Sequence, residues 1–379
     1  MEFARHAKVI CGPICGLILG LVAVSATAGG HDKQAEMDHS GHDMSGHDMA
    51  GHSTDRDEMG RRLHGMKHNV SPEIADQLRE NIYGWENVSD AEIALSMQMM
   101  GSNYEWYLSN DDVSGKTGVL ILLHGFGDRG DKIFKDQLQP FASAFPMSLS
   151  MGMSMMMSQH IQLGLDDLVA AGAERIIVIP IVSTEYNTMI RQWQYIFGIL
   201  DQPSYASVPR VSTTAEISFM SPPNDDPIVA EMLLDHAMEI SENPAEEVVI
   251  VVAHGPSLPA DNVKQLVIMD NLAKFVKDDG GFAAVYSATL QDDAPPEMRD
   301  ANVAKLRAMV EQAHADGKRP IIVTSLIGAR TIQKKLRKDL AGLDYAFNAK
   351  GLVQHDLFVT WIGETVREEL ARTERAAAN

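Results

Sequence analysis

Cysteine is almost absent from this 379-residue chain, which limits the redox and metal chemistry open to it. The only two cysteines, Cys11 and Cys15, stand within the first 16 residues. The rest of the chain therefore offers neither disulfides nor thiolate ligands. Any soft-metal chemistry must use methionine and histidine.

Basic residues are also few, and several common motifs are missing. The 32 lysines and arginines face 52 acidic residues, a net charge of -20, which would repel a phosphate backbone and argues against nucleic acid as a partner. No phosphate-binding P-loop and no dinucleotide-binding glycine fingerprint occurs, so no nucleotide cofactor is expected. A hydrolase is disfavoured because the nearest candidate serines, Ser154 and Ser257, lack the flanking glycines of a nucleophile elbow.

The longest apolar run lies near the N-terminus and is typical of a secretory signal. Arg5 and Lys8 precede the run from Val9 to Ala23, and Ala26-Thr27-Ala28 follows it. We expect residues 1–28 to be a cleaved signal peptide, with an uncleaved anchor as the alternative. The expected location is periplasmic or extracellular, with no stable membrane association after cleavage.

Residues 29–70 form a segment rich in histidine and methionine, without apolar periodicity. The motif Gly-His-Asp-Met occurs at 41–44 and again at 46–49. Such a low-complexity segment cannot bury a core and is predicted to be disordered. Imidazole and thioether groups suit copper, cobalt, nickel or iron, so we expect metal binding here; a solubilising linker is the alternative. The candidate ligands are His39, His42, His47, His52, Met44 and Met49.

From Ser71 onward the pattern is that of a folded α/β protein. Apolar runs of strand length occur at 119–123, 176–182, 248–253 and 321–326. Amphipathic stretches of helical length lie between them, for example at 158–172, 226–241, 260–277 and 298–316. This alternation predicts doubly wound parallel sheets. We expect a helical lead-in at 71–115 and two duplicated α/β halves at 116–225 and 226–379.

The evidence for duplication is a His-Gly pair after two of the predicted strands. His124-Gly125 follows the first strand, and His254-Gly255 stands 130 residues later after another. Ligands of open parallel sheets bind beyond the carboxyl ends of the strands, where both histidines are expected. Each could instead be a structural hydrogen-bonding residue. We interpret the pair as functional because it recurs at equivalent positions.

These residues give the chain its resemblance to a known family. The strings LILLHGFGDRG, IIVIPIVSTEYN and VVIVVAHGP resemble the class II tetrapyrrole chelatases, specifically the CbiX/SirB-like sirohydrochlorin cobaltochelatases and ferrochelatases, over roughly residues 116–365. The resemblance implies a cleft between the halves in which a divalent metal enters a tetrapyrrole. It also implies that His124 is a metal ligand or pyrrole base, with His254 as its second-half equivalent.

The chain departs from the family pattern at two places. The family's glutamate after the second strand would fall within Met151 to Met155, and its histidine after the third strand is replaced by Val182-Ser183-Thr184-Glu185. Glu185 could serve as the catalytic proton acceptor, or could be a solvated loop carboxylate. His160 could be the missing metal ligand, or a surface residue at a helix start.

A methionine-rich stretch stands near the position of the missing glutamate. Polarizable methionines could line the flat face of a macrocycle, although methionine also fills irregular core space. The candidates for cofactor contact are Met151, Met153 and Met155.

The sequence thus predicts a chelatase-like enzyme, a lyase that inserts cobalt, iron or nickel into a sirohydrochlorin-type tetrapyrrole. The expected partners are a metal ion and a tetrapyrrole. The alternative is a non-catalytic periplasmic metal-binding or metal-delivery protein on the same scaffold. The missing polar groups and the expected compartment favour this alternative, while the retained histidine pair favours the enzyme.

Overall fold

A computed structural model describes residues 56–64, 70–99, 103–125, 127–152, 158–328 and 331–378. The predicted signal peptide, the candidate tail ligands and Met153 and Met155 lie outside these residues. Within the described part, no helix is long and apolar enough to cross a membrane.

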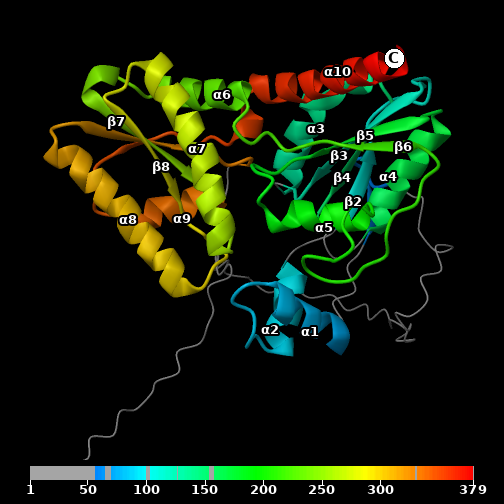
Figure 1. The fold of residues 1–379 in the computed structure, drawn as a ribbon, viewed down its shortest axis with the longest axis horizontal. Helices are drawn as coiled ribbons and strands as arrows, with labels where there is room; N and C mark the ends of the chain where they lie inside the picture. The colour runs from blue at the N-terminus through cyan, green and yellow to red at the C-terminus, as the bar shows by residue number, and fades with distance from the viewer. Residues whose placement is uncertain are drawn as a thin grey trace, which may run out of the picture. The chain divides into compact units, whose positions relative to one another are not determined.

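The described elements alternate between strands and helices for most of the chain (Figure 1). The strands are β1 (Arg62–His64), β2 (Asn103–Tyr107), β3 (Thr117–Leu123), β4 (Met147–Met151), β5 (Arg175–Pro180), β6 (Glu216–Phe219), β7 (Glu247–Ala253), β8 (Ala284–Thr289), β9 (Arg319–Thr324) and β10 (Ala346–Phe347). The helices are α1 (Pro72–Asn81), α2 (Asp90–Met99), α3 (Asp128–Ala142), α4 (Gln159–Ala170), α5 (Thr188–Ile196), α6 (Pro227–Met238), α7 (Pro259–Gly280), α8 (Pro296–Ala315), α9 (Thr331–Asp339) and α10 (Asp356–Ala378). Two short 3₁₀ turns, Pro244–Glu246 and Leu352–Gln354, complete the set.

The strand order confirms that the chain contains two copies of one α/β unit. The first sheet runs β1-β2-β4-β3-β5-β6, and the second runs β8-β7-β9-β10. In each half the His-Gly strand comes first in sequence, its neighbours are the second and third strands, and the fourth lies outside the third. These four strands are parallel in both halves. Both sheets therefore have the order 2-1-3-4, and the His-Gly strand lies at the point where the order reverses.

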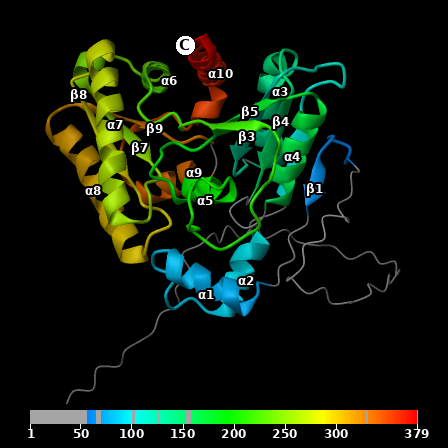
Figure 2. The same ribbon diagram turned by 45° about the vertical axis from the view of Figure 1, so that its right-hand side comes forward.

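The four predicted strands are the buried centres of the two sheets. β3 and β7 are almost completely buried along their length, as are β5 and β9. Continuous runs of valine, isoleucine and leucine form such strands because both sheet faces are covered by helices. Figure 2 shows α7 and α8 beside the second sheet and α3 and α4 beside the first.

The N-terminal boundary of the folded part differs from the prediction in two ways. Arg62–His64, expected to be disordered, forms β1 and pairs antiparallel with β2. β2 lies in the predicted helical lead-in, yet it pairs antiparallel with β4 and extends the first sheet. The buried side chain of Arg62 explains this, because its Nε donates to Glu105 Oε2 of β2 at 2.7 Å. A buried carboxylate needs such a cation.

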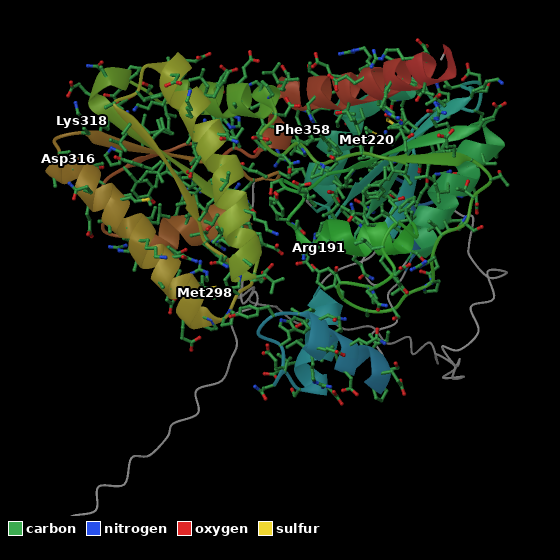
Figure 3. All side chains as sticks on the ribbon, viewed as in Figure 1. Arg191, Met220, Met298, Asp316, Lys318 and Phe358 are labelled. Carbon is green, nitrogen blue, oxygen red and sulfur yellow. The ribbon has the colours of Figure 1, made fainter. Side chains whose placement is uncertain are left out.

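The C-terminal helix crosses from the second half to the first. α10 contacts α6, and it also packs on α3 and β5. The ring of Phe358 at its start lies 6.0 Å from that of Phe134 on α3 (Figure 3 labels Phe358). One apolar core therefore extends through both halves.

A buried histidine on α6 predicts acid sensitivity of the fold. The ring of His236 is 1% exposed and lies 5.4 Å from that of His355. Burial, helped by the charges of His355 and Lys350 and opposed by those of Glu239 and Asp235, lowers the pKa of His236 to about 4. Between pH 6.5 and 4 the unfolded chain therefore binds a proton that the folded chain does not. The free energy of unfolding should fall by roughly 3 kcal/mol over this range.

Chemical denaturation at several pH values measures this effect. The variant His236→Leu should lose most of the acid-dependent slope, because its side chain cannot titrate. His314→Leu, at an exposed position, is the matched control and should keep the wild-type slope. An unchanged slope in His236→Leu would assign the acid sensitivity to other groups.

Candidate functional site

Both His-Gly pairs adopt the same backbone arrangement at the ends of equivalent strands. Gly125 and Gly255 have φ angles of +99° and +79°, which glycine adopts readily and other residues rarely do. The backbone of each glycine hydrogen-bonds the ring of the histidine before it. The repeat predicted from sequence is therefore a repeat of local geometry.

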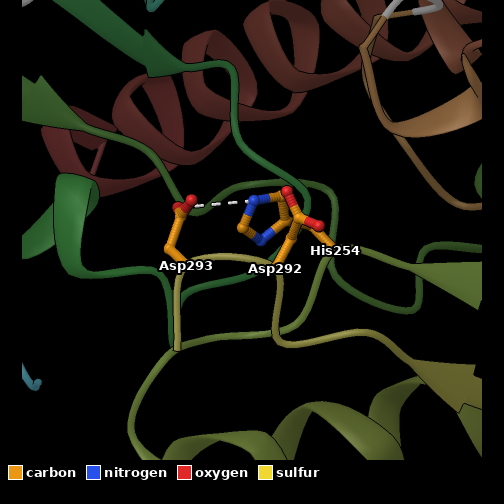
Figure 4. A group of neighbouring side chains, drawn as sticks. All are labelled: His254, Asp292 and Asp293. Atoms are coloured by element: carbon orange, nitrogen blue, oxygen red, sulfur yellow. Dashed lines mark ion pairs between the residues drawn. The ribbon is translucent and has the colours of Figure 1, made fainter. Parts of the chain in front are cut away.

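The second-half histidine faces a carboxylate that the sequence analysis missed. His254 Nδ1 hydrogen-bonds the carbonyl oxygen of Gly255 at 2.9 Å, and its Nε2 lies 3.3 Å from Asp293 Oδ2 (Figure 4). A ring that donates from Nδ1 is, when neutral, an acceptor at Nε2. Two acceptors then face one another, and a cation between them removes the conflict. Two ligands of a tetrahedral metal ion are separated by about 3.3 Å.

Asp292 completes the one group of three candidate metal ligands found in the described part of the chain. Single ligand atoms of His254, Asp292 and Asp293 all lie within 4.8 Å of one another. Asp292 is already neutralised, because it accepts from Arg299 Nε at 2.7 Å and from Lys335 Nζ at 2.5 Å. Burial acts to raise the pKa of Asp292, but these hydrogen bonds outweigh it and lower the pKa. Asp293 is therefore the carboxylate more available to a metal.

A strained residue holds this acidic pair against the histidine loop. Gln291 has a φ of +49°, which is uncommon for a residue with a side chain. Its side-chain amide donates to the carbonyl oxygens of Pro256 and Ser257, at 2.9 and 3.2 Å. The backbone N–H of Asp292 also donates to the His254 carbonyl oxygen at 3.3 Å. The loop after β8 is thus fastened to the loop after β7.

The first-half histidine shares the electrostatic environment of this group. His124 is solvent-accessible, but the surrounding protein partly excludes water, and this desolvation lowers its pKa. The charge of His254 lowers it as well, while Gly125, Asp293 and Asp131 oppose the shift. A lowered pKa keeps the ring neutral near pH 7, the form that binds metals. His124 therefore lies within the electrostatic range of His254 and Asp293.

The carboxylate of Asp131 is held in place by a neighbouring tyrosine. The hydroxyl of Tyr104 in β2 donates to Asp131 Oδ2, and the guanidinium of Arg61 lies 4.8 Å from the Tyr104 ring centre. The strands that precede the first half therefore contribute to the surroundings of His124.

The comparisons with known proteins identify similar folds only. No family model and no curated protein matches the chain. It is similar to SirB from Bacillus subtilis, solved with Fe3+, at 15% identity and a TM-score of 0.48, covering 66% of this chain and 96% of that one. It is also similar to DR2241 from Deinococcus radiodurans, a multi-domain protein described as structurally similar to chelatases, at 17% identity and a TM-score of 0.42, covering 65% and 54%.

The two matches are likenesses of fold. The account of the site rests on this chain's own residues.

The other predicted site residues do not join the His254 group. Glu185 is exposed, and its backbone N–H donates to Asn224 Oδ1 at 2.9 Å. His160 is completely buried in α4 and so is not the surface residue of the alternative interpretation. Met151 is completely buried in the apolar core, which favours core filling over contact with a macrocycle. Catalytic and binding roles for these residues remain predictions.

Proposed function

We propose that the strand-end group of His124, His254 and Asp293 binds a divalent transition metal and inserts it into a tetrapyrrole. The observation that carries the proposal is the 3.3 Å approach of Asp293 Oδ2 to the Nε2 of His254, an atom left free by the Gly255 hydrogen bond. Imidazole and carboxylate together suit cobalt, nickel, iron and zinc. The metal is a substrate in this proposal, and cobalt, iron or nickel is the expected choice.

The chemistry required of the residues is limited. Metal entry into a tetrapyrrole forms four metal–nitrogen bonds and releases two protons from pyrrole nitrogens. His254, Asp293 and neutral His124 would hold the ion while it loses water, and the carboxylate of Asp293 would accept a pyrrole proton as the ion leaves it. Asp293 is half exposed, so a proton it accepts can pass to solvent.

Insertion of Co2+ into sirohydrochlorin, followed by absorbance, tests this function. The protein should accelerate insertion over the uncatalysed rate, and His124→Ala should reduce the rate at least tenfold. The exposed residue His314 offers a control, and His314→Ala should keep the full rate. Equal rates with and without protein would exclude the enzymatic role. Unchanged rates in His124→Ala would remove this residue from the mechanism.

The second candidate function is metal delivery without turnover. One observation favours it: the exposed carboxylate of Glu185 lies outside the His254 group. Few groups other than Asp293 are then available at the site to accept protons from the pyrrole nitrogens. The seven histidines between residues 31 and 68 would then collect the ion. Deletion of residues 31–54, which spares the structural Arg62, should lower bound metal several-fold. In this case the protein would bind no macrocycle.

A further inference from the structure

The α1–α2 hairpin, residues 71–99, is a small unit held together mainly by its own contacts. Ser71 caps α1 by accepting from the Ile74 backbone N–H at 3.3 Å. Arg79 donates to the Val88 carbonyl oxygen at 2.7 Å and pairs with Asp76 and Asp90. A small apolar cluster of its own contains Ala75, Leu78 and Ile93.

In the described part of the chain, a short strip, residues 205–207, attaches the hairpin to the first half. Ala206 is completely buried in the apolar cluster of the hairpin. Asn81 Nδ2 donates to the Tyr205 carbonyl oxygen at 3.0 Å, and Gln77 Oε1 accepts from the Ser207 backbone N–H at 2.6 Å. Burial raises the pKa of the Tyr205 hydroxyl, and the charge of Asp293 raises it further. The strip therefore lies within the electrostatic range of Asp293.

The tip of the hairpin touches the second half, two residues beyond Asp293. Gly84 has a φ of +85°, and a Cβ added to it would lie 3.0 Å from Cγ of Pro295. Figures 1 and 2 both place α1 and α2 below α5, and Figure 3 labels Met298 at the start of α8 on this same side. The hairpin thus contacts both the 205–207 strip and Pro295, which stands two residues after Asp293.

We propose that the α1–α2 hairpin is a cap that selects ligands at the strand-end group by size. This inference rests on the proposed function. A hydrated ion can reach Asp293 with the hairpin in place. A tetrapyrrole must bring its central nitrogens to the same atoms, and in this proposal the hairpin lifts from Pro295 and from the 205–207 strip to admit it. Among the described residues the contacts to be broken are the two hydrogen bonds to the strip, the buried Ala206 and the approach of Gly84 to Pro295, and a segment held by a small set of contacts can open locally.

A reversible cross-link tests the cap. Gly84→Cys and Pro295→Cys are combined with Cys11→Ser and Cys15→Ser, so that the new pair is the only possible disulfide. Oxidation should slow association of metal-free sirohydrochlorin at least tenfold, followed by fluorescence, and a reductant should restore it. The Co2+ titration curve should be the same in both states. Equal sirohydrochlorin association in the oxidised and reduced forms would overturn the cap.

A second variant avoids dependence on the disulfide. Gln77→Ala with Asn81→Ala removes both hydrogen bonds to the body and leaves the apolar cluster of the hairpin intact. Sirohydrochlorin should then associate several-fold faster, and an unchanged rate would contradict the cap. If the wild-type protein binds no sirohydrochlorin at all, the proposed function fails and the cap with it. Binding that is insensitive to both variants refutes the cap alone.

Discussion

Replacing His254 with alanine is expected to weaken Co2+ binding at the strand-end group at least a hundredfold. The substitution removes the one imidazole that faces Asp293 at 3.3 Å, and it leaves Asp292 neutralised by Arg299 and Lys335. Loss of one of two or three ligands commonly costs several kcal/mol of binding free energy, and each 1.4 kcal/mol is tenfold. Isothermal titration of a chain that begins at Asp55, the start of the compact unit, removes the candidate tail ligands of residues 31–54, including both Gly-His-Asp-Met motifs.

Two further variants make this prediction specific. Asp293→Asn keeps the size of the side chain and removes its charge, so Co2+ affinity should fall by a similar amount. His355→Ala, at the junction of α6 and α10, should leave Co2+ affinity unchanged. Wild-type affinity in His254→Ala would show that the ion binds elsewhere.

The variant Arg62→Met is expected to destabilise the fold by about 3 kcal/mol or more at pH 8. Glu105 is completely buried, and Arg62 is its cation. Without Arg62 the carboxylate keeps Ser148 Oγ, which donates at 2.8 Å, and the more distant guanidinium of Arg56 at 4.0 Å. A buried charge that loses its close partner costs about 3 to 5 kcal/mol. Burial already raises the pKa of Glu105 despite Arg62. Protonation at lower pH should therefore relieve part of the loss, since a group with a raised pKa loses stability as pH rises.

Guanidinium unfolding at pH 8 and pH 5 measures the effect as the difference between variant and wild type. That difference should be larger at pH 8. The double variant Arg62→Met with Glu105→Gln should recover much of the stability, because the completely buried position 105 then carries no charge. Lys132→Met, which breaks an exposed pair with Asp136, should cost less than about 1 kcal/mol. A similarly small loss in Arg62→Met would mean that β1 contributes little to the fold.

The central strands and the duplication could be predicted because they depend on local sequence patterns. β3 and β7 are continuous apolar runs buried on both faces, and each is followed by the same His-Gly pair. β4 was implied only by the resemblance, as the second strand before Met151 to Met155, because its sequence, MSLSM, alternates serine with apolar residues and forms no continuous apolar run. β2 was missed because it joins the sheet through pairing with β4, which its own residues do not indicate.

Asp293 could not be found from local patterns because its role depends on strand order. β8, AVYSAT, is a partly exposed edge strand, so no long apolar run marked its end. Only the pairing of β7 with β8 brings the loop of Asp293 to His254. The available signal was the pair Asp292-Asp293 shortly after a strand. Ligands bind beyond the carboxyl ends of parallel strands, the rule that singled out His124 and His254, and the same rule would have indicated this pair. The side-chain amide of Gln291 joins the two loops, and no sequence pattern marks this residue for that role.

The central claim is that imidazoles from both halves serve one metal ion. Pulsed electron paramagnetic resonance of one equivalent of Cu2+ bound to the chain from Asp55 onward counts the coordinated imidazole nitrogens. The wild-type protein should show two, and His124→Ala and His254→Ala should each show one. A wild-type spectrum with a single imidazole, or two imidazoles retained in His124→Ala, would contradict the account.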